Sequence, residues 1–162
     1  VLGEQLQLNC SKYLVTDENL TPTGEMAPVA GTPMDFTKAK TLGEDIRKPF
    51  AALAFGKGYD NCYVIDGYKK GEMALAAVLT DEVSGRTLEV LTTQPAVQIY
   101  TGNWLMGCPA TKSGNRTYFD YDGVAIECQG MPDAPNHANF PSQVLDKGEQ
   151  YAQSIVFRFS TK

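Results

Sequence analysis

Histidine is nearly absent from this sequence, and its cysteines do not occur in closely spaced pairs. The 162 residues contain one histidine, His137, and no C-x-x-C spacing. The four cysteines are Cys10, Cys62, Cys108 and Cys128. Zinc clusters use Cys and His ligands grouped at such spacings, so a zinc site is not expected. An even number of cysteines permits disulfides but does not establish them.

Long apolar runs and clusters of basic residues are also missing. The longest apolar run, residues 73–79, is far shorter than the roughly 18 residues that a membrane-spanning helix needs. The formal net charge is -5, and the 14 Lys and Arg residues are scattered along the chain. Proteins bind a phosphate backbone through clustered positive charge. We therefore expect no membrane and no nucleic acid as a partner.

The composition is that of an ordinary globular protein. Hydrophobic residues make up 43% of the chain and charged residues 20%, and the length suffices for one substantial core. We expect a single domain over residues 1–162. Three N-x-[S/T] sequons, at Asn9, Asn19 and Asn115, favour a secreted protein. The alternative is that they arose by chance in a cytoplasmic protein.

Alternation at the start of the chain and several short strand-like runs after it predict a protein built mainly of β-strands. Residues 5–10 alternate polar and apolar side chains, as in a strand with one buried face. Further strands are predicted at residues 62–66, 73–79, 87–92, 96–100, 116–121, 124–128 and 151–159. Ser84-Gly85 and Asp122-Gly123 predict hairpin turns, so consecutive strands should pair antiparallel. The expected fold class is all-β, a sandwich or a barrel.

The segment between the first two predicted strands is rich in turn-forming residues. Prolines and glycines follow one another closely over residues 22–33, which predicts turns between short extended pieces. Residues 37–48 have near-helical spacing, but Gly43 interrupts the pattern and Pro49 ends it. Only a short helix is expected there.

Several motifs, taken in order, resemble the galactose mutarotase (aldose 1-epimerase) family. The first half of the chain contains PTGE at 22–25, GTPMDF at 31–36, GYD at 58–60 and SGR at 84–86. The second half contains QPAVQIYTGN at 94–103, ECQ at 127–129, PDAPN at 132–136, FPS at 140–142 and GEQY at 148–151. The motifs need no large insertion, and together they cover almost the whole chain.

The resemblance implies a large antiparallel β-sandwich of the galactose mutarotase-like supersandwich type. Residues 1–162 would form its C-terminal part, about half of that body. The sequence begins Val-Leu-Gly, without an initiator methionine or a signal peptide. We therefore expect a cleaved or split product, with the N-terminal half of the same protein as a companion chain. Dividing a sandwich exposes strand edges and apolar faces that favour reassociation.

The resemblance also implies an aldose 1-epimerase, which interconverts the α and β anomers of free hexoses such as galactose and glucose. A base takes the proton of the anomeric hydroxyl and an acid protonates the ring oxygen, so no cofactor is required. By the motif match the base is Glu127. It follows Ile126 in an apolar strand, where an unpaired carboxylate is costly unless it faces a polar cleft. The alternative is that Glu127 lies on the solvent face of an alternating strand.

Two further residues are implied to bind the sugar. Asp60 matches an aspartate that accepts hydrogen bonds from sugar hydroxyls, and Gln98 matches a cleft amide that both donates and accepts. The alternatives are a turn-stabilising aspartate and an outward-facing glutamine. The family commonly has histidine after this aspartate, whereas this chain has Asn61, so local hydrogen bonding is expected to differ.

Other candidate residues are given no role in the site. Three aromatic residues could stack on a pyranose, but aromatics in strand-rich domains are more often core residues: Tyr59, Tyr100 and Trp104. Three polar residues of the matching motifs have turn-like settings and are interpreted as structural: Arg86, Asp133 and Asn136. His137 lies in a proline-rich loop where the family shows no catalytic histidine.

The catalytic acid implied by the resemblance is a histidine upstream of this chain, accompanied by a second sugar-binding histidine and usually an arginine. Activity should therefore require the N-terminal half. One alternative is a non-catalytic carbohydrate-binding module or an inactive fragment of the same fold. Another is a relative that epimerises hexose 6-phosphates, which should place extra cationic residues near a phosphate.

Overall fold

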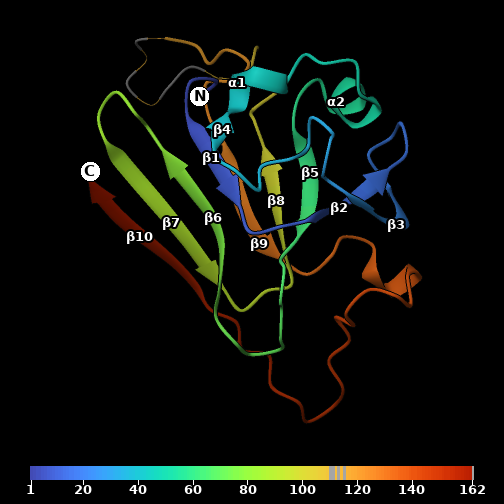
Figure 1. Ribbon diagram of the computed structural model, residues 1–162. Helices are drawn as coiled ribbons and strands as arrows, with labels where there is room; N and C mark the ends of the chain where they lie inside the picture. The colour runs from blue at the N-terminus through green and yellow to red at the C-terminus, as the bar shows by residue number, and fades with distance from the viewer. Residues whose placement is uncertain (110–111, 113, 115, 162) are drawn as a thin grey trace.

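The computed structural model describes residues 1–109, 112, 114 and 116–161, which form two antiparallel five-stranded sheets (Figure 1). In spatial order, the first sheet contains β10 (Ile155–Thr161), β7 (Arg86–Thr92), β6 (Ala74–Thr80), β1 (Gln5–Leu8) and β4 (Lys40–Thr41). The second contains β3 (Pro22–Pro28), β2 (Lys12–Thr16), β5 (Asp60–Val64), β8 (Ala96–Tyr100) and β9 (Ala125–Gln129). The all-β prediction is confirmed. Asn115, the first residue of the third sequon, lies outside the described residues.

The helices in the described residues are short. They are α1 (Leu42–Asp45), α2 (Ala51–Gly56) and a 3-10 turn, η1 (Ala134–Asn136). The short helix predicted within residues 37–48 is α1. The sequence analysis did not predict α2, which ends at Lys57 in the left-handed conformation (φ 59°), where its N–H donates to the Leu53 carbonyl. None of the described helices is long and apolar enough to cross a membrane.

The hydrophobic core lies between the two sheets. Alternation places Leu6 and Leu8 of β1 on one buried face, while Tyr63 of β5 and Ile99 of β8 point inward from the other sheet. Each of these four side chains is at most 1% exposed. The inner face of the second sheet is mainly apolar, although Asn61 also lies on it, and Asp60 and Gln98 lie on the outer face.

The hairpin predicted at Ser84-Gly85 joins β6 to β7. The carboxylate of Asp81 accepts the Val83 and Ser84 N–H groups at 3.0 and 3.3 Å, and Gly85 adopts a positive φ of 71°. Arg86, the last residue of the SGR motif, starts β7 directly after this turn. The strands predicted at 62–66, 73–79, 87–92, 96–100 and 124–128 are β5 to β9, with no end displaced by more than two residues.

The strand predicted at residues 116–121 is wrong, and so is the Asp122-Gly123 hairpin. Residues 116–119 have no regular secondary structure, and residues 120–122 form a turn and a bend. Asp122 accepts the Phe119 N–H at 2.9 Å and pairs with Arg116, while Tyr121 takes the positive φ of 68°. Side-chain hydrogen bonding from Asp122 therefore competes with strand pairing and closes a local loop.

β3 lies in the segment 22–33, for which turns between short extended pieces were predicted, and β2, which was not predicted, precedes it. β3 forms the edge of the second sheet and begins and ends with proline. Proline has no backbone N–H to donate to a neighbouring strand. It is therefore tolerated in edge strands, which pair on one side only. Residues that signal turns in an isolated sequence are therefore compatible with this outer strand.

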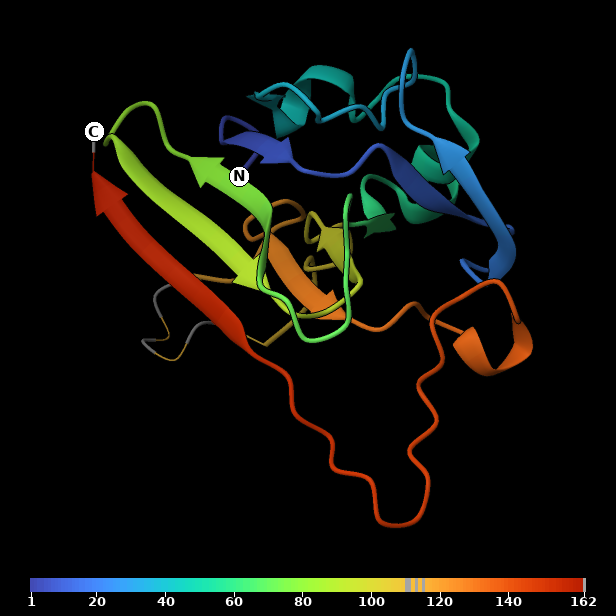
Figure 2. The same cartoon turned by 60° about the horizontal axis from the view of Figure 1, so that its bottom comes forward.

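The chain returns from the second sheet to the first through a long segment, residues 137–154. This segment loops away from the two sheets before β10 begins (Figure 2). Its end is attached to the loop between β7 and β8. Gln94 Nε2 donates to Tyr151 Oη at 2.9 Å, and Thr93 Oγ1 donates to Gln153 Oε1 at 2.5 Å. These bonds align β10 beside β7.

Gly102 should be among the least replaceable glycines. Its φ is 65°, and an added Cβ would lie 2.7 Å from the Gly123 carbonyl oxygen and 2.8 Å from Leu105 Cδ1. We expect Gly102→Ala to lower the free energy of unfolding by about 3 kcal/mol, because left-handed strain is combined with a backbone clash. Gly71→Ala is the matched control, since φ is 84° there but no atom lies within 4 Å of an added Cβ. It should cost about 1 kcal/mol in urea unfolding. Equal losses would contradict the clash.

The four cysteines are free thiols, and we expect only Cys108 to react rapidly. Burial raises the pKa of Cys62 to about 12 and raises the pKa of Cys10 and Cys128, so these three hold little thiolate at pH 8. Cys108 is partly exposed. Ellman's reagent should titrate one fast equivalent in the native protein, and Cys108→Ser should remove it. Two fast equivalents would show that another thiol is accessible.

Candidate active site

Strand register brings the three residues predicted from sequence onto the outer face of the second sheet. Gln98 of β8 lies opposite Cys62 of β5 on one side and opposite Glu127 of β9 on the other. Asp60 precedes Cys62 by two residues and therefore points to the same face. The three candidates consequently come from three adjacent strands and face one space.

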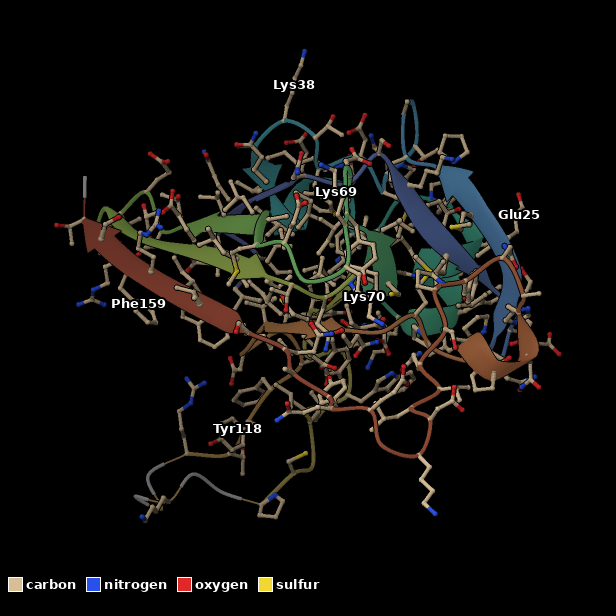
Figure 3. All side chains as sticks on the ribbon, turned by 90° about the horizontal axis from the view of Figure 1, so that it is seen from below. Glu25, Lys38, Lys69, Lys70, Tyr118 and Phe159 are labelled. Carbon is tan, nitrogen blue, oxygen red and sulfur yellow. The ribbon has the colours of Figure 1, made fainter. Side chains whose placement is uncertain are left out.

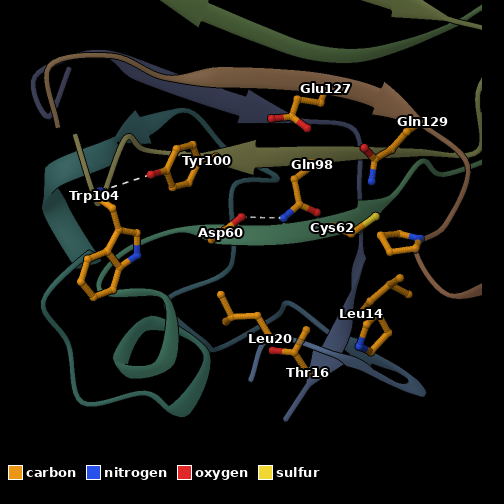
Figure 4. A pocket seen from close by; sticks show the side chains of 12 residues that line it. Leu14, Thr16, Leu20, Asp60, Cys62, Gln98, Tyr100, Trp104, Glu127 and Gln129 are labelled. Carbon is orange, nitrogen blue, oxygen red and sulfur yellow. Dashed lines mark hydrogen bonds between the residues drawn. The ribbon is translucent and has the colours of Figure 1, made fainter. Parts of the chain in front are cut away.

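A cavity of about 440 Å³ opens over these side chains (Figure 4). This volume lies within the range of about 300–1,000 Å³ that is typical of small-ligand sites. Asp60, Gln98 and Glu127 all line it. The remaining lining residues come from the five strands of the same sheet and from loops beside them. The strand residues are Leu14 and Thr16 of β2, Pro22 of β3, Cys62 of β5, Tyr100 of β8 and Gln129 of β9, and the loop residues are Leu20, Trp104 and Pro132.

Asp60 and Gln98 form a hydrogen-bonded pair. The Gln98 amide donates from Nε2 to Asp60 Oδ1 at 2.8 Å, and both side chains are partly buried. This bond orients the amide, and it leaves the Gln98 carbonyl oxygen and the second Asp60 oxygen as acceptors. The pair can therefore bind hydroxyl donors at defined positions.

Glu127 is exposed, and its carboxylate lies above Gln98 on the cavity side (Figure 4). The contacts found among the described residues include no hydrogen bond or ion pair of this carboxylate. Of the described residues that line the cavity, none is a histidine, lysine or arginine. The solvent face of β9 is also the face of the cavity, so the position of Glu127 is compatible with either alternative. Its oxygens are free to accept a proton.

Cys62 forms part of the cavity floor. It is buried to 4% exposure, and burial raises its pKa to about 12. The thiol is therefore protonated at neutral pH and contributes a small, uncharged surface rather than a nucleophile.

Two of the sequence motifs fix the backbone that directly precedes Asp60. The Thr101 N–H donates to the Tyr59 carbonyl at 3.0 Å, and Thr101 Oγ1 accepts the Tyr59 N–H at 3.2 Å. The fully buried Asn103 donates from Nδ2 to the carbonyl oxygens of Gly56 and Tyr59 at 2.7 and 2.9 Å. The GYD and TGN motifs therefore lock the end of β8 to the start of β5, next to the cavity.

Of the three aromatic residues given no role in the site, Tyr100 and Trp104 line the cavity, whereas Tyr59 lies away from it. Tyr59 is fully buried, and its hydroxyl donates to the Pro33 carbonyl at 3.0 Å. Asn61, which stands where the family commonly has histidine, lies on the inner face and is 1% exposed. Its side chain therefore points away from the cavity. Its Oδ1 accepts the Asp60 N–H at 3.2 Å.

His137 has a structural position beside β3. Its Nε2 lies 3.3 Å from the Pro22 carbonyl oxygen and 3.2 Å from Asp133 Oδ2. Asn136 donates to Asp133, so this motif is internally bonded. Gly24 makes room for the ring, since an added Cβ would lie 2.6 Å from His137 Nδ1. In the part of the chain that the structure covers, no group of three His, Cys, Asp or Glu side chains could hold a metal ion.

Sequence reasoning missed several cavity residues for two different reasons. Gln129 and Cys62 lie two positions from Glu127 and Asp60, so alternation alone could have placed them on the same face. Leu14 and Thr16 belong to β2, which was not predicted, so no signal from that segment connected them to the site.

The chain is similar to known aldose 1-epimerases in sequence. The family model for aldose 1-epimerase matches residues 1–158. Human galactose mutarotase is 39% identical over 96% of this chain and 43% of its own length. The aldose 1-epimerase of Escherichia coli is 34% identical over 98% of this chain and 45% of its own length. The chain thus spans less than half the length of these relatives.

Solved structures match over nearly the whole chain. An aldose epimerase homologue from C. elegans superposes with a TM-score of 0.83 at 28% identity, covering 99% of this chain and 46% of that one. A galactose 1-epimerase from Lactobacillus acidophilus superposes with a TM-score of 0.74 at 26% identity, covering 99% and 44%. Sequence and fold agree over the same residues, and the chain belongs to the aldose 1-epimerase family.

Proposed function

We propose that this chain supplies the catalytic base and part of the sugar site of an aldose 1-epimerase that acts on free hexoses such as galactose and glucose. The observation that carries the proposal is the free Glu127 carboxylate, which faces a cavity beside the hydrogen-bonded Asp60–Gln98 pair. Membership of the aldose 1-epimerase family supports this chemistry over other uses of the same side chains.

The reaction requires two proton transfers. Glu127 would take the proton from the anomeric hydroxyl while an acid protonates the ring oxygen, so that the bond between C1 and the ring oxygen breaks. The open-chain aldehyde then rotates about C1–C2, and the reverse transfers close the ring on the other face. A positioned acid or base typically accelerates such a step by ~10²–10⁴-fold.

Asp60 and Gln98 would orient the sugar against Glu127. An ionised aspartate accepts hydrogen bonds from hydroxyls, and the Gln98 amide provides an acceptor beside it. β5 and β8, which carry Asp60 and Gln98, pair directly with each other, and Gln98 lies opposite Glu127 of β9. A hexose held by this pair would present one edge to the carboxylate.

The acid would come from residues outside this chain. The lining of the cavity contributes no histidine, and the family members that match are more than twice as long as the matched segment. We infer that an N-terminal half, present as a companion chain, completes the cleft.

A non-catalytic carbohydrate-binding module is the second candidate. It is favoured by the same cavity, because its lining residues can accept hydrogen bonds from sugar hydroxyls but include no evident catalytic acid. Such a module would bind sugars without accelerating the exchange of anomers.

Replacing the base should abolish activity. In polarimetry of freshly dissolved α-D-galactose and α-D-glucose, we expect the assembled protein to accelerate mutarotation and Glu127→Gln to reduce kcat by about 10³-fold, because the amide cannot accept the proton. The assembled protein means this chain mixed with the N-terminal half of human galactose mutarotase.

Glu72→Gln is the matched control, because Glu72 is exposed in a turn, pairs with Lys69 and does not line the cavity. It should leave the rate unchanged. Full activity in Glu127→Gln would refute its assignment as the base. If no sample accelerates mutarotation although the sugar binds, the binding-module alternative is preferred.

Apolar side chains of β10 mark where the companion would bind. β10 is an edge strand, and all seven of its residues are exposed. Its large apolar residues, which Figure 3 illustrates with Phe159 at the rim of the molecule, are 41–76% exposed: Ile155, Val156, Phe157 and Phe159. Exposed apolar edge strands favour pairing with another polypeptide.

Charge on β10 should therefore weaken assembly. We expect the double substitution Phe157→Lys/Phe159→Lys to raise the dissociation constant for the N-terminal half at least tenfold in analytical ultracentrifugation. Two lysine ammonium groups would then have to be buried where the wild-type chain buries phenylalanine rings. Val83→Lys is the control, because Val83 is 98% exposed at the tip of the β6–β7 turn. A monodisperse wild-type chain with no affinity for the N-terminal half would contradict the companion proposal.

A further inference from the structure

Trp104 is a large apolar side chain that remains exposed at the entrance of the cavity. It is the only tryptophan of the chain, lines the cavity and is 59% exposed (Figure 4). An indole is among the most strongly buried side chains on average. Its exposure beside a polar cavity therefore calls for a functional explanation.

The backbone and the ring of Trp104 are both held in place. Its N–H donates to Tyr100 Oη at 3.2 Å, and the residue directly follows the fully buried Asn103. The Lys57 ammonium lies 4.7 Å from the centroid of the indole ring, within the range of a cation–π contact. One face of the ring is thus covered by Lys57.

Lys57 is itself anchored at three points. Its backbone takes the left-handed cap of α2, and its carbonyl accepts the Tyr121 hydroxyl at 2.6 Å. Its ammonium pairs with Asp120, which also accepts the Met106 N–H at 2.9 Å. The hydrogen bond from Lys57 lowers the pKa of the Asp120 carboxyl, so this pair stays charged at neutral pH and is lost only as the pH falls below the usual aspartate range.

We propose that Trp104 is the stacking platform for the apolar face of the hexose, and this inference rests on the sugar-binding role proposed for the cavity. A pyranose carries its hydroxyls around the rim and C–H groups on its faces. The hydroxyls would bind Asp60 and Gln98, and a C–H face would pack on the indole face that Lys57 leaves open. Lys57 and Asp120 are positioning residues for this platform.

Because the chain has one tryptophan, its fluorescence reports directly on this contact. Titrating the isolated chain with D-galactose should change the Trp104 emission saturably, with the dissociation constant that calorimetry gives for the same solution. Glycerol at equal concentration, which has no ring, should leave the emission unchanged.

Substitutions separate a stacking role from a structural one. We expect Trp104→Ala to raise the dissociation constant, and the KM of the assembled protein, about tenfold while kcat changes little. Trp104→Phe, which keeps a flat face, should restore both to within about threefold. Met106→Ala is the matched control, because Met106 is 65% exposed on the same loop but does not line the cavity.

The outcomes distinguish this inference from the proposed enzyme. Saturable binding without a change in emission, an unchanged dissociation constant in Trp104→Ala, or no saturable binding would each overturn the platform. A loss of kcat equal to the rise in KM, unrescued by Trp104→Phe, would also overturn it by indicating a structural role. If mutarotation is not accelerated but Trp104 responds to galactose as expected, the platform stands and the catalytic proposal fails.

Discussion

The register between β5, β8 and β9 is the constraint on which the candidate site depends. Gln98 pairs with Cys62 on one side and with Glu127 on the other, which fixes the three polar side chains on one face. A shift of one residue in either pairing would turn a polar side chain into the apolar core and an apolar one into the cavity. The energy of the buried layer, including Tyr63, Val97 and Ile99, therefore also enforces the geometry of the site.

The motifs around Asp60 reinforce this register at one end. Thr101 and Asn103 bind the backbone of Tyr59 and Gly56 with buried hydrogen bonds. Buried polar networks of this kind are costly to break because any unpaired group loses its partner without gaining water. Part of the GYD and QPAVQIYTGN motifs thus forms a buried clamp beside Asp60 and Gln98, the residues proposed to bind the sugar.

Much of the fold could be predicted from the sequence, because β5 to β9 coincide with short strand-like runs that lack helical periodicity. The sequence could not show that β5 pairs with β8 or β8 with β9, since these pairings join segments that are far apart along the chain. The Asp122-Gly123 turn was predicted wrongly because Asp122 bonds locally to Phe119. For the site, Asp60, Gln98 and Glu127 were placed through the family resemblance, whereas Trp104 gained significance only when its contact with Lys57 was visible.

The central claim is that Asp60, Gln98 and Glu127 form one sugar site in which Glu127 faces the anomeric carbon. A crystal structure of the chain with D-galactose tests this most directly. We predict the anomeric hydroxyl at about 2.6–3.2 Å from the Glu127 carboxylate, with other hydroxyls on Asp60 and Gln98. Galactose bound elsewhere, or bound in this cavity with C1 directed away from Glu127, would contradict the account.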